Sequence, residues 1–123
     1  MPKGILVVNV AIGKDAYLAG TAGNNVAVGA DAMKATTSGT QQVAVGKAAM
    51  QSNTTGDYNT ALGYYSLSAV TTGYGNLAMG YYAGTSVTSG YNNTLIGYSA
   101  DPSSNSATNQ TVIGYGADGQ ADN

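Results

Sequence analysis

A glycine that returns at a nearly constant interval constrains this chain more than any other feature. It closes a short apolar run seven times, at Gly13, Gly29, Gly46, Gly63, Gly80, Gly97 and Gly114. The interval is sixteen once and seventeen in every later step. Four residues before each glycine stands an Asn or a Gln, from Asn9 to Gln110. A repeat that covers nearly the whole chain predicts one small unit stacked many times.

The length of the repeat indicates which unit is stacked. A period of seventeen is too short for a helix pair or a propeller blade. Two short runs of residues, each ended by a glycine turn, fit one coil of a parallel β-solenoid. Coils stacked at a strand spacing of about 4.8 Å would give about seven coils in a rod roughly 30 Å long. We expect this repeat domain to cover residues 9–123, after an N-terminal strand or docking segment over residues 1–8.

Stacking places equivalent residues of successive coils in columns. The amides from Asn9 to Gln110 are expected to form a hydrogen-bonded ladder, as stacked Asn and Gln side chains do elsewhere. A second column of hydroxyls is expected at Thr37, Thr54, Thr71 and Thr88. The repeat glycines are expected at tight corners with positive φ, where a Cβ would clash.

The apolar runs have the form Val-Ala-Val, and alternate side chains of a strand point to opposite faces. A coil this small encloses little volume, so one face is internal and the other needs a cover. Leaving branched side chains in water would forfeit about 1.5–3 kcal/mol each. The sequence therefore predicts self-association through an apolar stripe along the rod. The stripe consists of Val10, Ile12, Val26, Val28, Val43, Val45, Leu62, Met79, Ile96 and Ile113.

The composition excludes several classes of function. The chain has no Cys and no His, so disulfides, thiolate nucleophiles and imidazole-based catalysis or metal binding are excluded. It has four Lys, no Arg and a net charge of −2, which disfavours nucleic acid as a partner. No apolar run approaches the roughly 18 residues of a membrane span, and residues 1–8 do not resemble an export signal. We expect no enzymatic activity, no cofactor, no metal and no membrane insertion.

The aspartates have a simple interpretation. They lack the double-glycine nonapeptide pattern of calcium-binding rolls, and they form no column that extends along the rod. We expect them to be solvated turn residues. This applies to five of the six aspartates: Asp15, Asp31, Asp57, Asp101 and Asp118.

The tyrosines gather in the second half of the chain, and four of them occupy the position directly after the repeat glycine. These four are Tyr64, Tyr81, Tyr98 and Tyr115, and Tyr65 and Tyr82 double the pattern. Two interpretations stay open. The column holds receptor sugars by stacking, helped by Asn92, Asn93 and Asp57, or its rings support one another over the turns.

The repeats resemble a known family. The segments 24–29, 41–46 and 58–63 read NNVAVG, QQVAVG and YNTALG, and they resemble the head repeats of trimeric autotransporter adhesins. The longer unit NTALGYYSL at 59–67, with Thr-Thr-Gly following, is more similar to a version found in bacteriophage tail-fibre and related virion proteins. The resemblance covers residues 9 to about 119. It implies a left-handed parallel β-roll and a side-by-side homotrimer, with the apolar stripe as the trimer core.

The resemblance also implies a function. We expect a non-enzymatic structural or adhesive virion protein, either a section of a tail fibre or a surface-decorating protein. Its expected partners are other virion proteins and a glycan or protein receptor on the host surface. The alternative is the adhesive head of a trimeric autotransporter on a bacterial cell surface, although these 123 residues contain no coiled-coil stalk.

Overall fold

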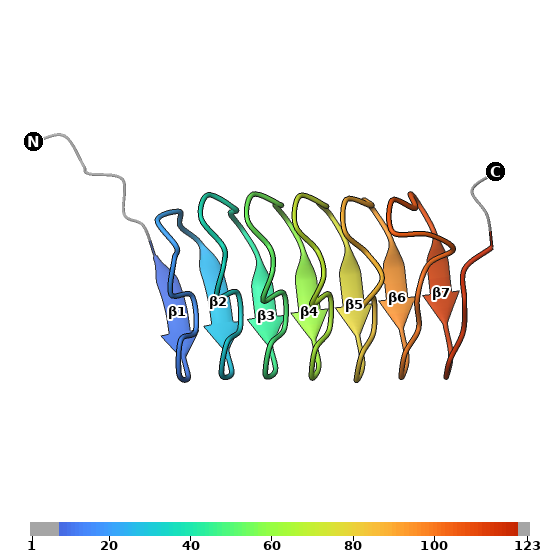
Figure 1. The fold of residues 1–123 in the computed structure, drawn as a ribbon, viewed down its shortest axis with the longest axis horizontal. Helices are drawn as coiled ribbons and strands as arrows, with labels where there is room; N and C mark the ends of the chain where they lie inside the picture. The colour runs from blue at the N-terminus through green and yellow to red at the C-terminus, as the bar shows by residue number, and fades with distance from the viewer. Residues whose placement is uncertain (1–7, 121–123) are drawn as a thin grey trace, which may run out of the picture.

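The computed structural model describes residues 8–120, and within that range the chain is all-β with no helix. Seven short strands lie side by side in one parallel sheet, in the order in which they occur along the chain (Figure 1). The strands are β1 (Asn9–Ile12), β2 (Asn25–Val28), β3 (Val43–Val45), β4 (Thr60–Leu62), β5 (Leu77–Met79), β6 (Thr94–Ile96) and β7 (Thr111–Ile113). The predicted N-terminal strand or docking segment lies outside the described residues, apart from Val8, which precedes β1.

The strand register follows the sequence repeat without a slip. Asn9 pairs with Asn25 across the shorter first interval, and Val43 pairs with Thr60 across one of the later intervals. Each turn of the chain therefore brings equivalent residues of the repeat together. Six turns connect the seven strands, and the seventh coil is described as far as Gln120 (Figure 1). The predicted β-solenoid is confirmed.

The interior of the solenoid is narrow and is filled mostly by small side chains. The central residue of each strand from β2 to β5 is a fully buried alanine, and β6 and β7 have Leu95 and Val112 there. Larger side chains enter from the other side of the coil, where Met33, Met50 and Leu67 occupy equivalent repeat positions. Because alternate strand residues point to opposite faces, the flanking Val, Ile and Leu side chains lie outside.

The predicted amide ladder runs through this interior. Asn59, Asn76 and Asn93 are almost fully buried, and the backbone N–H of each later residue donates to Oδ1 of the earlier one at 3.0–3.1 Å. The Nδ2 groups of Asn76 and Asn93 also donate to the carbonyls of Gly90 and Ala107, at 2.8 and 2.7 Å. Buried polar groups cost free energy unless they are hydrogen-bonded. The ladder therefore pairs the buried amides and also holds neighbouring coils in register.

The ladder changes at the third coil, where Gln replaces Asn. The Oε1 of Gln42 accepts from Nδ2 of Asn53 at 2.7 Å and from Nδ2 of Asn59 at 3.4 Å. Its Nε2 is buried with no hydrogen-bond partner. The extra methylene of Gln therefore displaces the amide from the position that Asn occupies in neighbouring coils.

The repeat glycines lie at corners with positive φ, as predicted. Gly29 has φ of 133° and Gly80 has φ of 140°, values that side chains rarely adopt. A Cβ on either residue would lie 2.5 Å from the carbonyl oxygen of the next glycine in the column. Both the backbone conformation and the close contact between coils therefore require glycine here.

The threonine column forms hydrogen bonds of a different kind from the amide ladder. Thr37 Oγ1 donates to the backbone carbonyl of Thr54 at 3.1 Å, and Thr54 Oγ1 donates to that of Thr71 at 3.2 Å. Thr71 and Thr88 continue the pattern at 3.3 Å. The hydroxyls thus bond the backbone of the next coil rather than one another.

Candidate assembly and binding surface

The outer face of the sheet carries all the residues of the predicted apolar stripe. In β2 the burial of side chains alternates, with Asn25 and Ala27 inside and Val26 and Val28 half-buried on the outer face. The remaining strands continue this alternation, except β1, the first strand of the described sheet, where Ala11 is also exposed. The ten stripe residues are Val10, Ile12, Val26, Val28, Val43, Val45, Leu62, Met79, Ile96 and Ile113.

The outer face carries fewer apolar side chains toward the β7 end of the rod, except in β5, where Leu77 and Met79 are both apolar. In β1, β2 and β3 both outward positions are apolar, whereas β4, β6 and β7 have Thr60, Thr94 and Thr111 at the first of them. The second outward position is apolar in every strand. Exposure is greatest at the two ends, where Ile12 is 60% and Ile113 is 66% exposed. An uncovered apolar row of this length is typical of an interaction surface rather than of a solvated face.

The four tyrosines that follow the repeat glycine form one stacked column. The ring centroids of Tyr64 and Tyr81 are 5.0 Å apart, and the next two steps, to Tyr98 and to Tyr115, are 5.2 Å each. The planes of successive rings differ by 6°, 9° and 19°. The spacing between successive rings is therefore close to the spacing between neighbouring strands.

Two further pairs of tyrosines stack in the second half of the chain. Tyr65 and Tyr82 stack at 5.5 Å, and both contact Tyr64 edge-on or at a tilt. Tyr74 and Tyr91 stack at 4.8 Å with planes 4° apart. This last pair was not singled out from the sequence, although its separation by one repeat was the signal that could have identified it.

The stacking decides which parts of the rings are available to a ligand. Within the column the faces of successive rings point at one another, so the ring edges are the parts left for a ligand to contact. Exposure rises from 36% at Tyr64 to 84% at Tyr115. Partial burial raises the pKa of the Tyr81 phenol, and its Coulombic interaction with Tyr82 adds to the shift. The mutual support of the rings, one of the two interpretations above, is the geometry observed; receptor binding stays a prediction.

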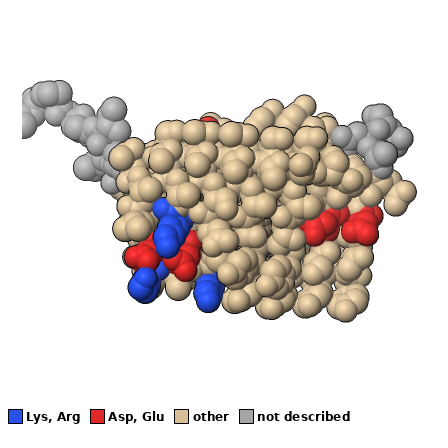
Figure 2. Space-filling model, viewed as in Figure 1, with Lys and Arg blue, Asp and Glu red and all other residues tan. Residues whose placement is uncertain are grey.

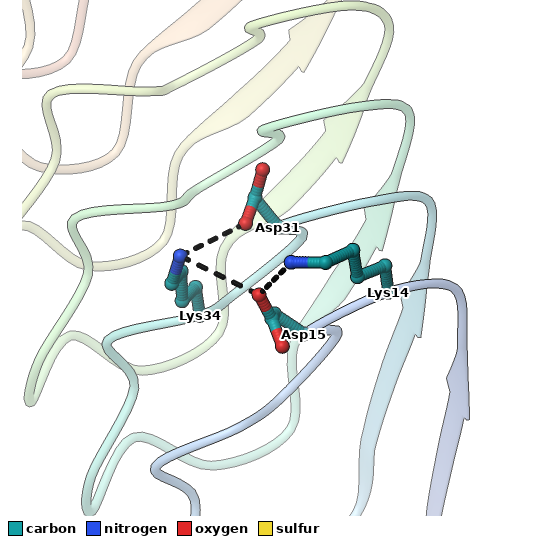
Figure 3. Close-up of polar contacts among 4 residues, drawn as sticks. All are labelled: Lys14, Asp15, Asp31 and Lys34. Atoms are coloured by element: carbon teal, nitrogen blue, oxygen red, sulfur yellow. Dashed lines mark hydrogen bonds and ion pairs between the residues drawn. The ribbon is translucent and has the colours of Figure 1, made fainter.

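The position that holds tyrosine in later coils holds Lys14, Ala30 and Lys47 in the first three. Figure 2 shows Lys and Asp side chains gathered near the β1 end, and acidic side chains alone toward the β7 end. Lys14 Nζ donates to Asp15 Oδ2 at 2.7 Å, and Lys34 Nζ lies 3.0 Å from Asp31 and 3.7 Å from Asp15 (Figure 3). Of the three pairs, the one between Lys34 and Asp15 joins the first two coils.

The ion pairs alter the titration of their members. The hydrogen bond from Lys14 holds the pKa of the Asp15 carboxyl below its ordinary value. The same hydrogen bond raises the pKa of Lys14. Since each cation is matched by a carboxylate, the cluster presents no excess charge for a ligand.

Two of the other predicted solvated aspartates instead bind the coil before them. Asp57 Oδ1 accepts from the backbone N–H of Thr40 at 2.7 Å and from its hydroxyl at 3.0 Å. Asp101 accepts from the backbone N–H and hydroxyl of Ser86 at 2.9 and 3.0 Å. The expectation of purely solvated side chains was wrong for these two, because the turn of the next coil lies directly over the preceding one.

The predicted polar helpers of the tyrosine column are not all on the surface. Asn92 is exposed, but Asn93 is 1% exposed and belongs to the internal ladder. Asn93 therefore cannot contact a receptor, and its inclusion was wrong. In residues 8–120 no three His, Cys, Asp or Glu side chains are grouped so that they could hold a metal ion. The described part of the chain also has no helix suited to crossing a membrane.

A scan of the chain against protein-family models, a search of curated proteins and a search of solved structures each found no match. The function proposed below therefore rests on the repeat pattern and on the geometry of these surfaces.

Proposed function

We propose that the protein is a non-enzymatic structural rod that assembles side by side as a homotrimer through the outer face of its sheet. In this proposal the coils are left-handed and the apolar stripe lies at the trimer axis. The rod serves as a section of a phage tail fibre or as a surface-decorating virion protein. The similarity of the repeat unit at 59–67 to virion proteins supports this setting.

The observation that carries the proposal is the apolar outer face. Single-chain burial leaves Ile12, Val45 and Met79 exposed in one continuous row, while the interior is already filled. Burying such side chains contributes about 1.5–3 kcal/mol each. A partner with the same row in the same register would cover the face along its whole length, and a second copy of the chain meets that requirement.

The oligomeric state of the full chain tests the assembly. We expect sedimentation equilibrium and light scattering to give a trimer of the 12.3 kDa chain. Val45→Asp should produce a folded monomer, because an isolated chain leaves this side chain partly in water, whereas a trimer would bury three unpaired carboxylates.

A matched control keeps the added charge and moves it away from the sheet. Thr55 is exposed and lies outside the strands, so Thr55→Asp should remain trimeric. A wild-type chain that is folded and monomeric at micromolar concentration would overturn the assembly.

The exposed tyrosine column would serve as a receptor-binding surface either in the virion protein or in the alternative, an adhesive head on a bacterial surface. Tyr81→Ala combined with Tyr98→Ala should abolish adsorption to cells or glycans if this edge binds a receptor. Three columns per trimer would add avidity to weak individual contacts. Normal adsorption by the double variant would show that the sides of the rod do not bind.

The location of the native protein separates the two settings. Antibodies raised against the chain should label purified virus particles in immunogold electron microscopy. Labelling confined to the bacterial outer surface would instead support the adhesive head.

A further inference from the structure

The stacked tyrosines have a chemical property that neither assembly nor receptor binding uses. Phenol rings held in adjacent pairs are positioned to react with each other when they are oxidised. Tyr64, Tyr81, Tyr98 and Tyr115 provide three successive pairs at 5.0–5.2 Å, and Tyr74 with Tyr91 provides another at 4.8 Å.

Backbone hydrogen bonds between coils fix the positions of the residues that carry these ring pairs. The N–H of Tyr82 donates to the carbonyl of Tyr64 at 2.9 Å, and the N–H of Ser99 donates to that of Tyr81 at 2.9 Å. The N–H of Asn92 donates to the carbonyl of Tyr74 at 3.0 Å in the same way. The ring pairs therefore have little freedom to separate, because the adjoining backbones are hydrogen-bonded between coils.

Exposure and composition favour the same reaction. Tyr64 is 36% exposed and the exposure increases toward Tyr115, so an oxidant in solution reaches the outer ring edges that carry the hydroxyl and Cε atoms. The chain contains neither Trp nor Cys. Neither of these readily oxidised side chains is therefore present to donate an electron to a tyrosyl radical and so remove it before two tyrosines couple.

We propose that the tyrosine columns are sites of oxidative cross-linking between successive coils of one chain, with hydrogen peroxide and a haem peroxidase as the oxidising system. Each of two neighbouring tyrosines loses one electron and one proton from its hydroxyl. The two radicals join by a bond between their Cε atoms, and the hydrogen on each Cε leaves as a proton while each oxygen regains one. Two tyrosines and one hydrogen peroxide thus yield one dityrosine and two water molecules.

The product would tie each coil covalently to the next, one repeat away along the chain. Coils at the end of a solenoid can unfold locally, because each contacts only its neighbours. Cross-links between neighbouring tyrosines of the column that runs from Tyr64 to Tyr115 would oppose that fraying in the second half of the rod. We therefore expect the oxidised protein to melt at a higher temperature than the untreated protein.

The test is oxidation of the full folded chain with hydrogen peroxide and a haem peroxidase. We expect dityrosine fluorescence and a mass loss of two hydrogen atoms per cross-link at the mass of a single chain. Chains labelled with heavy and with light nitrogen are unfolded, mixed and refolded together before oxidation, so that a trimer contains both labels and a cross-link within one chain can be distinguished from one between chains. Peptides that are all heavy or all light support the proposal, whereas mixed peptides alone would overturn it.

Two variants with equal numbers of tyrosines test the geometry. Both carry Tyr65→Phe and Tyr82→Phe, so that only the main column and the Tyr74–Tyr91 pair remain stacked. One adds Tyr98→Phe and Tyr115→Phe, which leaves Tyr64 and Tyr81 adjacent. The other adds Tyr81→Phe and Tyr115→Phe, which leaves Tyr64 and Tyr98 two coils apart.

We expect the first variant to form the Tyr64–Tyr81 cross-link and the second to form at least about tenfold less of a Tyr64–Tyr98 cross-link, since reaction depends on positioned neighbours. The Tyr74–Tyr91 cross-link is the internal reference in both. Equal yields in the two variants would overturn the proposal. Wild-type chain oxidised in denaturant should lose the preference for partners one repeat apart, and retention of that preference would also contradict a role for the fold.

Discussion

The first and second halves of the rod place different chemistry on the same backbone. Directly after the repeat glycine, the first coils carry Lys14 and Lys47, whereas later coils carry Tyr64 and Tyr81. Lys14 joins an ion-pair cluster, and the tyrosines form a stack. The parallel register is the same in both halves. The close spacing between coils therefore supports either kind of contact, and the side chains along the edge can change without altering the fold.

The interiors of the two halves differ as well. In the second half Asn59, Asn76 and Asn93 form a regular ladder with every amide nitrogen bonded. In the first half Thr36 Oγ1 and Gln42 Nε2 are buried without hydrogen-bond partners. An unpaired buried polar group costs about 1–3 kcal/mol. We expect the first half of the rod to be the less stable one, which the following variants examine.

The largest expected effect concerns the backbone that the halves share. Gly29→Ala in the first half and Gly80→Ala in the second should each lower the free energy of unfolding by about 3 kcal/mol or more. Each substitution combines a disfavoured φ with a Cβ placed 2.5 Å from a carbonyl oxygen. Urea denaturation followed by circular dichroism measures the loss.

Gly114→Ala is the matched control, because its φ is 137° but its Cβ would meet only the Cβ of Ala117 at 3.6 Å. It should cost less than the other two variants. If Gly29→Ala and Gly80→Ala differed widely, the backbones of the two halves would not be equivalent.

A smaller effect is expected from exchanging the amides of the ladder. Gln42→Asn should raise the free energy of unfolding by on the order of 1 kcal/mol, since the shorter amide removes an unpaired Nε2 and restores the ladder. The reverse exchange, Asn76→Gln, should lower it by a similar amount. Thermal unfolding of both variants provides the comparison. If Gln42→Asn were destabilising, the hydrogen bond from Asn53 to Gln42 would matter more than the ladder.

The smallest effect is expected at the ion pairs of the first half. Asp15→Asn should lower the melting temperature slightly at neutral pH, and added salt should reduce the difference. The pKa of Asp15 is lowered in the folded chain, so its contribution is present above the ordinary aspartate pKa and is lost as the pH falls through the lowered value. The variant and the wild type should therefore converge in acid.

Lys47→Gln removes a charge that takes part in no recorded ion pair of the described residues, and it serves as the control. This variant keeps the Asp15 ion pairs, so the difference in melting temperature between it and the wild type should stay constant as the pH falls. A pH-independent difference between Asp15→Asn and the wild type would show that the carboxylate acts by packing alone.

The columns of the fold were predictable because they depend only on the repeat. A constant period places Asn59 under Asn76 and Gly63 under Gly80, whatever the coil does between them. The Tyr74–Tyr91 stack followed from the same rule. The acceptor of each threonine hydroxyl could not be predicted from the repeat. The backbone carbonyl and the hydroxyl of the next threonine are both near, and only the path of the chain selects between them.

The turns were less predictable than the strands. Ala48, Tyr65 and Tyr82 share one repeat position and adopt φ values of 57–58°. Glycine is the usual residue in this conformation, and neither alanine nor tyrosine signals it. The tight return of a small coil imposes the conformation, and hydrogen bonds to neighbouring coils hold it. Sequence patterns that identify turns by glycine therefore miss such a corner.

The sequence by itself determined the repeat, the parallel register, the amide ladder and the apolar row, because all four depend on which residues recur after one turn. The tertiary structure decided which parts of the columns face solvent. It placed Asn93 inside, turned the tyrosine faces toward one another and tied Asp57 to Thr40. Periodicity specifies the neighbour of each residue, but exposure and hydrogen-bond partners depend on the closed path of the coil in space.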